Sequence, residues 1–316
     1  EIERISHNNN ENKSNENNEN SFSFVIGADT QLGIGSNCLN WDYELSYSIK
    51  AVNYINTIQP KPSFVCICGD LIDMEPSIFK DRYTIEDCLR IQTEQFNDFK
   101  RVWNELDNDI PLLCLCGNHD VGNTPTAQSI QRFTTEFGND YFAFLFKTTY
   151  CICLNTNLYN DNSLAFDLYE KQHNWLEEQL IYAKNINVDQ IFLFGHHPWF
   201  LKHENETDEE LTGVNYIPNR PTEFIPDSYF HIKLEWRRNV MELCHKYNVT
   251  ACFAGHYHQN LITYSSWGMP MIVTGGICNW NTQSTDKDAT ITENTITGAG
   301  VRVVIVDKQY EHGFTH

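Results

Sequence analysis

The chain has 316 residues, of which 41% are hydrophobic and 13% aromatic, so it carries enough apolar surface to bury a sizeable core. Its 42 acidic residues outnumber 22 basic ones, and the formal charge of −20 argues against binding to nucleic acid or to an anionic membrane surface. No apolar run approaches the roughly 20 residues that a membrane span requires, so we expect no transmembrane segment.

The first 20 residues include eight asparagines and almost no apolar side chains, which predicts a disordered Asn-rich tail over residues 1–20. From residue 21 to residue 316, short apolar runs alternate with longer amphipathic segments, a pattern typical of a single α/β domain. Apolar runs bounded by Gly, Pro, Asn or Asp predict strands at Phe22–Ile26, Phe64–Cys68, Leu112–Cys116, Tyr141–Phe146, Cys151–Asn155, Ile191–Phe194, Thr250–Phe253, Pro270–Thr274 and Val301–Val306. Helical periodicity predicts helices at Tyr43–Ile58, Thr84–Leu106, Thr126–Phe137, Tyr169–Ala183 and Ile232–Tyr247.

Two of the predicted strands, Tyr141–Phe146 and Cys151–Asn155, are close enough to form a hairpin with a tight turn between them. Two long stretches, Lys202–Tyr229 and Asn281–Gly298, show no periodicity and are predicted to be irregular loops. In the last predicted helix, Arg237 flanks the apolar stripe, and we expect its charged side chain to lie in solvent.

The eleven cysteines include three Cys-x-Cys pairs, at Cys66 and Cys68, Cys114 and Cys116, and Cys151 and Cys153. A spacing of two places both thiols of a pair on one face of a strand, whereas thiolate metal sites favour Cys-x-x-Cys, so we predict buried core thiols. Free thiols indicate a reducing compartment, and we expect a cytoplasmic protein. Secretion stays open, because glycosylation sequons occur at Asn12, Asn205 and Asn248.

Five short polar motifs follow predicted strands, at the point where α/β sheets usually bind ligands. They are Gly27-Ala28-Asp29-Thr30-Gln31, Gly69-Asp70, Gly117-Asn118-His119-Asp120, Gly195-His196-His197-Pro198 and Gly255-His256-Tyr257-His258. A Gly-Asp pair alone is more often a turn than a ligand site, whereas the two imidazoles of Gly-His-x-His can point into one space. The recurrence of acidic, amide and imidazole groups at five strand ends predicts one shared site.

A shared site of this composition suits two divalent cations. A pair of metal ions about 3.5 to 4 Å apart needs a bridging carboxylate, for which Asp70 is the candidate, completed by oxygen and nitrogen ligands. Two cations would neutralise an anionic phosphate ester, which the charge of −20 otherwise repels, and would activate a water or hydroxide for in-line attack. The sequence therefore predicts metal-assisted hydrolysis of phosphate esters without a serine or cysteine nucleophile.

These motifs resemble those of the calcineurin-like metallophosphoesterase superfamily, in which Asp-x-His, Gly-Asp, Gly-Asn-His-Asp or Glu, His, and Gly-His-x-His recur in this order. The resemblance covers residues 22 to about 306 and implies an α/β fold, a four-layer αββα sandwich of two mixed β-sheets flanked by helices. It implies that the first metal ion is bound by Asp29, Gln31, Asp70 and His258, and the second by Asp70, Asn118, His196 and His256.

The resemblance also assigns roles around the substrate. It implies that His119 faces the phosphate as general acid or charge stabiliser, beside Asn118, and that Asp120 holds the imidazole of His119 in orientation. His197 is open to two interpretations, either a contact to the substrate or an ordinary packed histidine beside Pro198, and the second is the commoner case for such a residue.

Position 31 departs from the superfamily pattern, because Gln31 stands where most members have His. A carboxamide oxygen is a harder and weaker ligand than imidazole, so we expect the first site to favour Mn²⁺ or Mg²⁺, with Fe or Zn²⁺ also compatible. The motifs together, with Gln at this position, resemble those of one branch of the superfamily. Its members are described as cytoplasmic Ser/Thr protein phosphatases that act on a signalling kinase. That resemblance implies a phosphorylated protein as substrate, with a small phosphoester as the simpler possibility.

Two alternatives remain beside a protein phosphatase. A phosphodiesterase acting on nucleotides or lipid headgroups would use the same metal ions, and the ligand set does not separate the two activities. An inactive scaffold of the same fold is the third hypothesis. It is disfavoured because Gln31 is the only substitution among the expected ligands and retains a ligating oxygen. The sequence does not indicate an oligomeric state.

Overall fold

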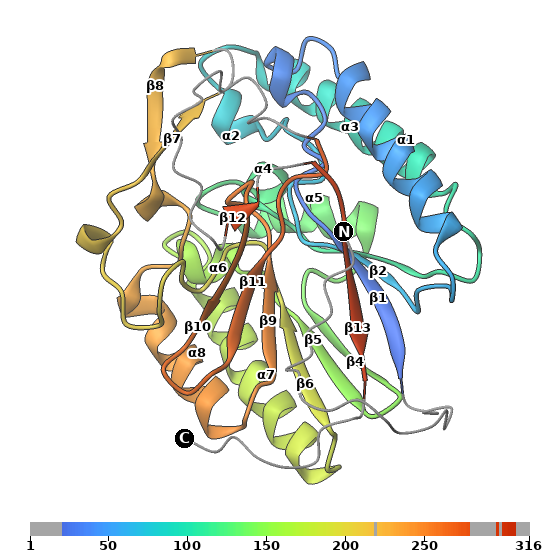
Figure 1. Cartoon of the computed structure of the whole chain (residues 1–316). Helices are drawn as coiled ribbons and strands as arrows, with labels where there is room; N and C mark the ends of the chain where they lie inside the picture. The colour runs from blue at the N-terminus through green and yellow to red at the C-terminus, as the bar shows by residue number, and fades with distance from the viewer. Residues whose placement is uncertain (1–20, 218–219, 279–294, 297–298, 308–316) are drawn as a thin grey trace.

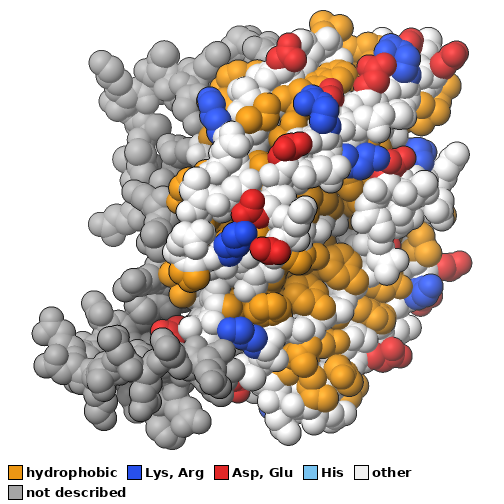
Figure 2. Space-filling view, turned by 90° about the vertical axis from the view of Figure 1, so that its right-hand side faces the viewer, with side chains coloured by type: hydrophobic (Ala, Val, Ile, Leu, Met, Phe, Trp, Pro, Cys, Tyr) orange, Lys and Arg blue, Asp and Glu red, His pale blue; other side chains and the backbone are white. Residues whose placement is uncertain are grey.

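The computed structural model describes residues 21–217, 220–278, 295–296 and 299–307 (Figure 1). The predicted tail at residues 1–20 and nearly all of the predicted loop at Asn281–Gly298 lie outside the described residues. Among the described residues, no helix has the length and apolarity needed to cross a membrane. Acidic and basic side chains are interspersed over the face seen in Figure 2, so the net charge is not gathered there in one acidic patch.

Strands and helices alternate along most of the chain. The strands are β1 (Phe22–Gly27), β2 (Val65–Ile67), β3 (Leu112–Cys114), β4 (Phe142–Phe146), β5 (Thr149–Cys153), β6 (Gln190–Phe194), β7 (Val214–Ile217), β8 (Arg220–Pro226), β9 (Ala251–Ala254), β10 (Asn260–Tyr264), β11 (Pro270–Val273), β12 (Thr295–Ile296) and β13 (Arg302–Val306). The helices are α1 (Asp42–Thr57), α2 (Pro76–Phe79), α3 (Ile85–Trp103), α4 (Asn118–Val121), α5 (Ala127–Phe137), α6 (Asn157–Asn160), α7 (Phe166–Asn185) and α8 (Leu234–Lys246).

The strands form two mixed sheets and a separate hairpin. One sheet has the order β13-β1-β2-β3, the other has the order β12-β10-β11-β9-β6-β5-β4, and among the described strands β7 pairs only with β8. Strands β1, β2 and β3 run parallel, as do β5, β6, β9 and β11, while β13, β10, β12 and β4 pair antiparallel at or near the sheet edges. Parallel strands require crossover connections, and helices supply most of them here, whereas β10 lies in the connection from β9 to β11.

Three hydrophobic clusters hold the layers together. Between the sheets, aromatic rings of one sheet pack on those of the other, with Phe24 at 5.8 Å from Phe194 and 5.6 Å from Phe253, measured between ring centroids. A second cluster joins the smaller sheet to α1, α3 and α5, and a third joins the larger sheet to α7 and α8. The arrangement is helix, sheet, sheet, helix, as the sequence resemblance implied (Figure 1).

The structure confirms the five predicted helices and the nine predicted strands, with shifts of up to three residues at their ends, and it corrects two expectations. The stretch Lys202–Tyr229 is not irregular, because it contains the β7–β8 hairpin, which its prolines and polar residues concealed. Arg237 is completely buried instead of solvated, since its guanidinium donates to the carbonyl oxygens of Glu204, Ile232 and Glu206. A buried charge satisfied in this way fixes the path of the chain that surrounds it.

Candidate metal centre

The predicted site residues come together at one edge of the sandwich. Parallel strands β1, β2, β3, β6 and β9 all end there, and they are followed by Asp29 and Gln31, Asp70, Asn118 and His119, His196, and His256 and His258, respectively. Six of these side chains are almost completely buried, at 4% exposure or less, namely Asp29, Gln31, Asp70, Asn118, His196 and His256. His119 and His258 keep about a fifth of their side-chain surface exposed, at 21% and 19%, so they lie where a ligand can enter.

Sharp turns bring the two sheets into contact at this edge. Five of the site residues have left-handed backbone angles, with φ of 52° at Asp29, 38° at Gln31, 51° at Asp70, 65° at His256 and 57° at His258. Non-glycine residues rarely adopt this conformation, and it clusters at functional sites. The turns allow the backbone amide of His256 in one sheet to donate to the Asp29 carboxylate in the other, at 3.0 Å.

Two glycines make room for the carboxylate at the centre. A Cβ atom added at Gly117 would lie 2.1 Å from Oδ1 of Asp70, and one added at Gly69 would lie 2.5 Å from Nδ1 of His196. Both distances are far below van der Waals contact. The Gly-Asp and Gly-Asn-His-Asp motifs therefore need glycine for the close approach of neighbouring strand ends.

Three ligand-type atoms converge on Nε2 of His196. This nitrogen lies 3.0 Å from Oδ1 of Asn118, 3.1 Å from Nδ1 of His256 and 3.4 Å from Oδ2 of Asp70. Nδ1 of His196 lies 2.8 Å from the carbonyl oxygen of Cys68, which can only accept, so Nδ1 donates and Nε2 is directed toward the other three groups. A buried point shared by a carboxylate oxygen, an amide oxygen and two imidazole nitrogens suits a divalent transition metal.

A second group lies beside it. Ligand atoms of Asp29, Asp70 and His258 all lie within 4.8 Å of one another, and Nε2 of His258 is 3.4 Å from Oδ1 of Asp29. The amide oxygen Oε1 of Gln31 and Nε2 of His256 are buried without a hydrogen-bond partner among the described residues. Buried polar atoms are rarely left unpaired. These unpaired atoms, together with two adjoining donor sets that share Asp70, fit two cations.

The protonation states of three ligand groups, His256, His258 and Asp70, favour cation binding. Two others carry protons that a cation must displace, because burial raises the pKa of Asp29 and, although burial opposes it, the Asp70 carboxylate raises the pKa of His196 to about 9. Burial, reinforced by the neighbouring imidazoles, holds the pKa of His256 well below its ordinary value, and burial lowers the pKa of His258 to about 4. Both rings are therefore neutral near pH 7, which is the form that ligates metals. Burial opposes ionisation of Asp70, but the nearby imidazoles of His196 and His119 lower its pKa overall, so this carboxylate remains charged.

The partner of His119 differs from the expectation. The structure corrects the role predicted for Asp120, whose carboxylate accepts from the backbone amides of Gly117 at 2.7 Å and Leu71 at 3.1 Å. Nδ1 of His119 lies instead 3.0 Å from Oδ1 of Asp73 and 3.1 Å from the carbonyl oxygen of Asp73. Although burial opposes it, the carboxylates of Asp70 and Asp73 raise the pKa of His119 to about 10.

Asp73 also connects His119 to the unusual residue at position 31. Nε2 of Gln31 donates to the same Oδ1 atom of Asp73, at 3.3 Å, while Oε1 of Gln31 has no partner in the described part of the chain. Sequence reasoning missed Asp73, although it stands three residues after Asp70 in the same strand-end motif. The side-chain nitrogen of Gln31 therefore binds Asp73, the residue that orients His119, while its side-chain oxygen can serve the candidate metal site.

His197 lies within the centre, and its contacts are compatible both with a residue that contacts the substrate and with an ordinary packed histidine. Its Nδ1 is 3.3 Å from Oγ1 of Thr156, its Nε2 has no partner among the described residues, and its ring centroid is 4.3 Å from that of His256. Together with His196 and His256 it forms a group whose ligand atoms lie within 4.8 Å of one another. Burial and then His196 hold the pKa of His197 well below its ordinary value, so its ring is neutral.

Thr156, which sequence reasoning also missed, supports the loop that carries both histidines. Its Oγ1 accepts hydrogen bonds from the backbone amides of His196 and His197, each at 2.9 Å. Next to it, Nδ2 of Asn157 donates to the carbonyl oxygen of Cys116 at 3.0 Å, directly before the Gly117 turn. The signal in the sequence was the polar run Asn155-Thr156-Asn157 after β5, another strand that ends at this edge.

Aromatic residues from the segment after β8 form one wall of the site. The ring centroids of Tyr229 and Phe230 each lie 5.3 Å from that of His256, and the hydroxyl of Tyr229 donates to Oδ1 of Asn123 at 3.0 Å. Asn123 also accepts from Nδ2 of Asn118, at 3.0 Å. The Lys202–Tyr229 segment therefore borders the candidate centre.

Comparisons with known proteins agree with this arrangement. The calcineurin-like phosphoesterase family model matches residues 23–260 of the chain. The serine/threonine-protein phosphatase CPPED1 of Homo sapiens is 33% identical over 266 residues, which cover 81% of this chain and 75% of that protein. The protein of the same name from Danio rerio is 31% identical over 266 residues, covering 81% of this chain and 76% of that protein.

Solved structures share the fold. A dimetal phosphatase from Danio rerio has a TM-score of 0.51 and 14% identity, with 81% of this chain and 88% of that chain covered. A purple acid phosphatase from yellow lupin (Lupinus luteus) has a TM-score of 0.56 and 12% identity, with 90% of this chain and 49% of that chain covered. At such identities the likeness concerns the fold alone.

Replacing Thr156 tests how the loop at His196 is held. Thr156→Val keeps the shape of the side chain but leaves two buried backbone amides without an acceptor, and we expect a loss of about 1–3 kcal/mol in the free energy of unfolding. Thr156→Ser keeps the acceptor and is the matched control. Urea denaturation of the metal-free protein measures both variants. Equal stability of the Val and Ser variants would show that the hydroxyl does not hold this loop.

Proposed function

The chain belongs to the calcineurin-like phosphoesterase family and is a metal-dependent phosphoesterase, and we propose that its substrates are proteins phosphorylated on serine or threonine. The observation that carries the proposal is the convergence of Asp70, Asn118 and His256 on Nε2 of His196. The relatives named serine/threonine-protein phosphatase support the substrate class, since they align with most of this chain.

We assign Asp29, Gln31, Asp70 and His258 to the first cation and Asp70, Asn118, His196 and His256 to the second. Two divalent cations, when bound, would supply positive charge to the phosphate ester and lower the pKa of a nucleophilic water. The chain itself supplies the frame. The Cys68 carbonyl fixes the ring of His196, and the backbone amides of His256 and His119 hold the carboxylates of Asp29 and Asp70.

His119 is the group we propose to act on the leaving oxygen. Asp73 engages Nδ1 of its ring, which leaves Nε2 for a ligand at the exposed side of the centre. An imidazole held in this way can donate a proton to the departing serine or threonine oxygen. The sequence resemblance gave Asp120 a part in this step, but its contacts to Gly117 and Leu71 make it a support of the turn around Asp70.

A cytoplasmic location is part of the proposal. Ten of the eleven cysteines are buried as core thiols, the placement expected for a chain that works in a reducing compartment. The structure also offers no thiol cluster among the groups able to hold a metal ion in the described part of the chain.

The metal preference follows from Gln31. After chelation, we expect Mn²⁺ or Mg²⁺ to restore hydrolysis of a phosphomonoester, and we expect Gln31→His to raise the affinity for Zn²⁺ measured by calorimetry. Asp70→Asn, which removes the shared carboxylate, should lower the rate by about 10²-fold or more. Full restoration of the unaltered protein by Zn²⁺ alone would contradict the argument from Gln31.

The substrate class is tested by comparing three compounds on the reconstituted protein. We expect hydrolysis of a phosphoserine peptide and of p-nitrophenyl phosphate, and little hydrolysis of bis-p-nitrophenyl phosphate, with kcat/KM as the readout. Activity on the diester alone would exclude the protein phosphatase and favour a nucleotide or lipid-headgroup phosphodiesterase. Absence of activity on all three, with metal ions bound, would favour an inactive scaffold.

The contact between Asp73 and His119 is tested through the leaving group. An acid that protonates the leaving oxygen matters most for a poor leaving group, so Asp73→Asn should lower kcat on the phosphoserine peptide by about 10²-fold or more and on p-nitrophenyl phosphate by much less. Asp120→Asn is the comparison variant, for which we expect a loss of stability and similar losses on both substrates. If Asp73→Asn lowered kcat equally on both substrates, Asp73 would not act through protonation of the leaving oxygen by His119.

A further inference from the structure

Strand β4 leaves one edge of the larger sheet open. It is the last strand of that sheet, with β5 as its one neighbour among the described strands. Its residues are half-buried or exposed, and Leu145 has 52% of its surface exposed. Open apolar edges are unusual in proteins, because an unpaired strand offers a template for another chain.

The hairpin geometry identifies which backbone groups face outward. A two-residue turn joins β4 to β5, and Phe146 pairs with Thr149 across it, so these two residues form the closing hydrogen-bonded pair. Because hydrogen-bonded pairs alternate, Phe142 and Phe144 also turn their peptide groups toward β5. The amide and carbonyl groups of Ala143 and Leu145 therefore point away from the sheet.

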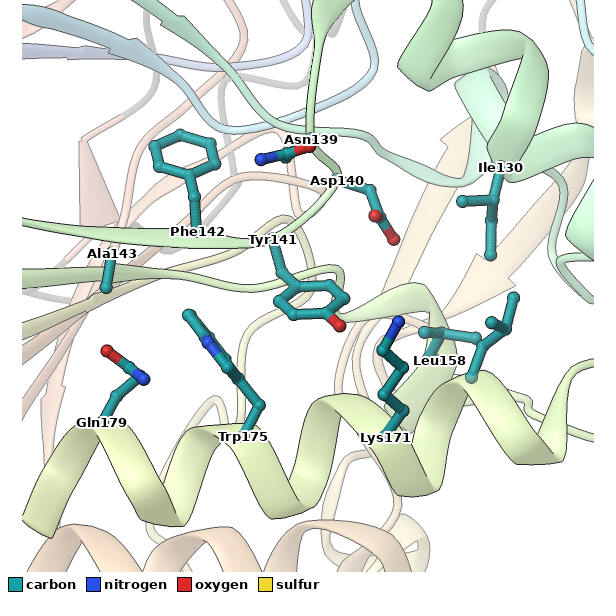
Figure 3. Close-up of a pocket in the computed structure, with 11 residues that line it drawn as sticks. Ile130, Asn139, Asp140, Tyr141, Phe142, Ala143, Leu158, Lys171, Trp175 and Gln179 are labelled. Carbon is teal, nitrogen blue, oxygen red and sulfur yellow. The ribbon is translucent and has the colours of Figure 1, made fainter.

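A cavity lies beside this edge, on the side covered by α7. It has a volume of about 530 Å³, and its lining includes Tyr141 and Ala143 from the β4 side and Lys171, Trp175 and Gln179 from α7. In Figure 3, Trp175 extends from α7 and Tyr141 extends toward it from the β4 side, and their ring centroids are 4.8 Å apart. Its volume lies within the range of roughly 300–1,000 Å³ that ligand pockets have, and its lining combines aromatic and polar side chains.

The open edge and the cavity fit one kind of occupant. In a strand added to β4, the residue opposite Ala143 would direct its side chain to the same face as Ala143, which is the face toward α7. A large apolar side chain at that position would enter the cavity against Trp175. We propose that β4 and this cavity bind an extended, basic segment of a partner protein by strand addition, with one large apolar side chain buried beside Trp175.

Charge decides against a second copy of this chain as the occupant. Each copy carries a net charge of −20, so two copies repel each other, whereas a basic segment is attracted. The single lysine in the cavity, Lys171, is accompanied by the carboxylate of Asp140, so the cavity itself does not reject a basic partner.

A display library of random dodecapeptides, selected against the full chain, tests the proposal. We expect enriched peptides with apolar residues at alternate positions and Lys or Arg at their ends. For the most enriched peptide, labelled with fluorescein, Trp175→Ala should weaken binding about tenfold or more in fluorescence anisotropy. Ala143→Phe fills the cavity without removing core contacts and should have the same effect, while Tyr54→Ala on the exposed face of α1 should have none.

Two further readouts complete the test. Hydrogen exchange should show new protection of the Ala143 and Leu145 amides in the complex, and hydrolysis of p-nitrophenyl phosphate should be unchanged in all three variants, which verifies that they fold. The proposal is overturned if no peptide is enriched, if binding survives both cavity variants, or if the two amides exchange as in the free chain. If the unaltered chain forms a dimer that protects these amides, the occupant of this edge is a second copy of the chain, and the proposal of a basic segment is overturned.

Discussion

The centre depends on one hydrogen bond that crosses between the two sheets, from Nδ1 of His196 to the carbonyl oxygen of Cys68. It ties the end of β6 in the larger sheet to the end of β2 in the smaller one. It also fixes which nitrogen of His196 is directed at Asp70, Asn118 and His256. A hydrogen bond made by the far nitrogen of a ligating imidazole sets its tautomer and orientation, and so the position of the cation. The same hydrogen bond therefore joins the two sheets and orients a proposed metal ligand.

The position of the site could be predicted from the sequence, because it follows from strand direction. Each motif stands after a run that ends in Gly or Cys-Gly, and the carboxyl ends of parallel strands meet at one edge. The pairing of two mixed sheets did not follow from the pattern of apolar runs. It was implied only by the resemblance, since short buried strands have the same appearance in one sheet or two.

Partners within the site were harder to predict than the site itself, as Asp120 and Asp73 illustrate. Both carboxylates lie within three residues of a predicted metal ligand, Asp70 or Asn118, but the backbone directs their side chains to different partners. Asp120 stands in the first turn of α4, where a carboxylate folds back to the free amides of that turn, and it accepts from Gly117 in this way. Asp73 lies past the turn after β2, and that turn directs it to the ring of His119. Buried Arg237 escaped prediction for a similar reason, because its carbonyl partners Glu204 and Glu206 are distant in sequence. The hairpin β7–β8 is local, and it escaped prediction because its prolines and polar residues conceal the strand pattern.

A single short loop after β5 joins the metal centre to the open edge of the sheet. Asn155 donates to the carboxylate of Asp140, which lines the cavity beside β4, at 2.9 Å. Thr156 holds the amides of His196 and His197, and Asn157 holds the carbonyl of Cys116 before the Gly117 turn. Since β5 lies in the sheet between β4 and β6, its continuation into this loop contacts groups on both sides.

These hydrogen bonds are buried or half-buried and leave little freedom to the loop, so the cavity and the centre are held at a fixed separation. A partner bound along β4 would then present its neighbouring segments to the centre from a constant direction.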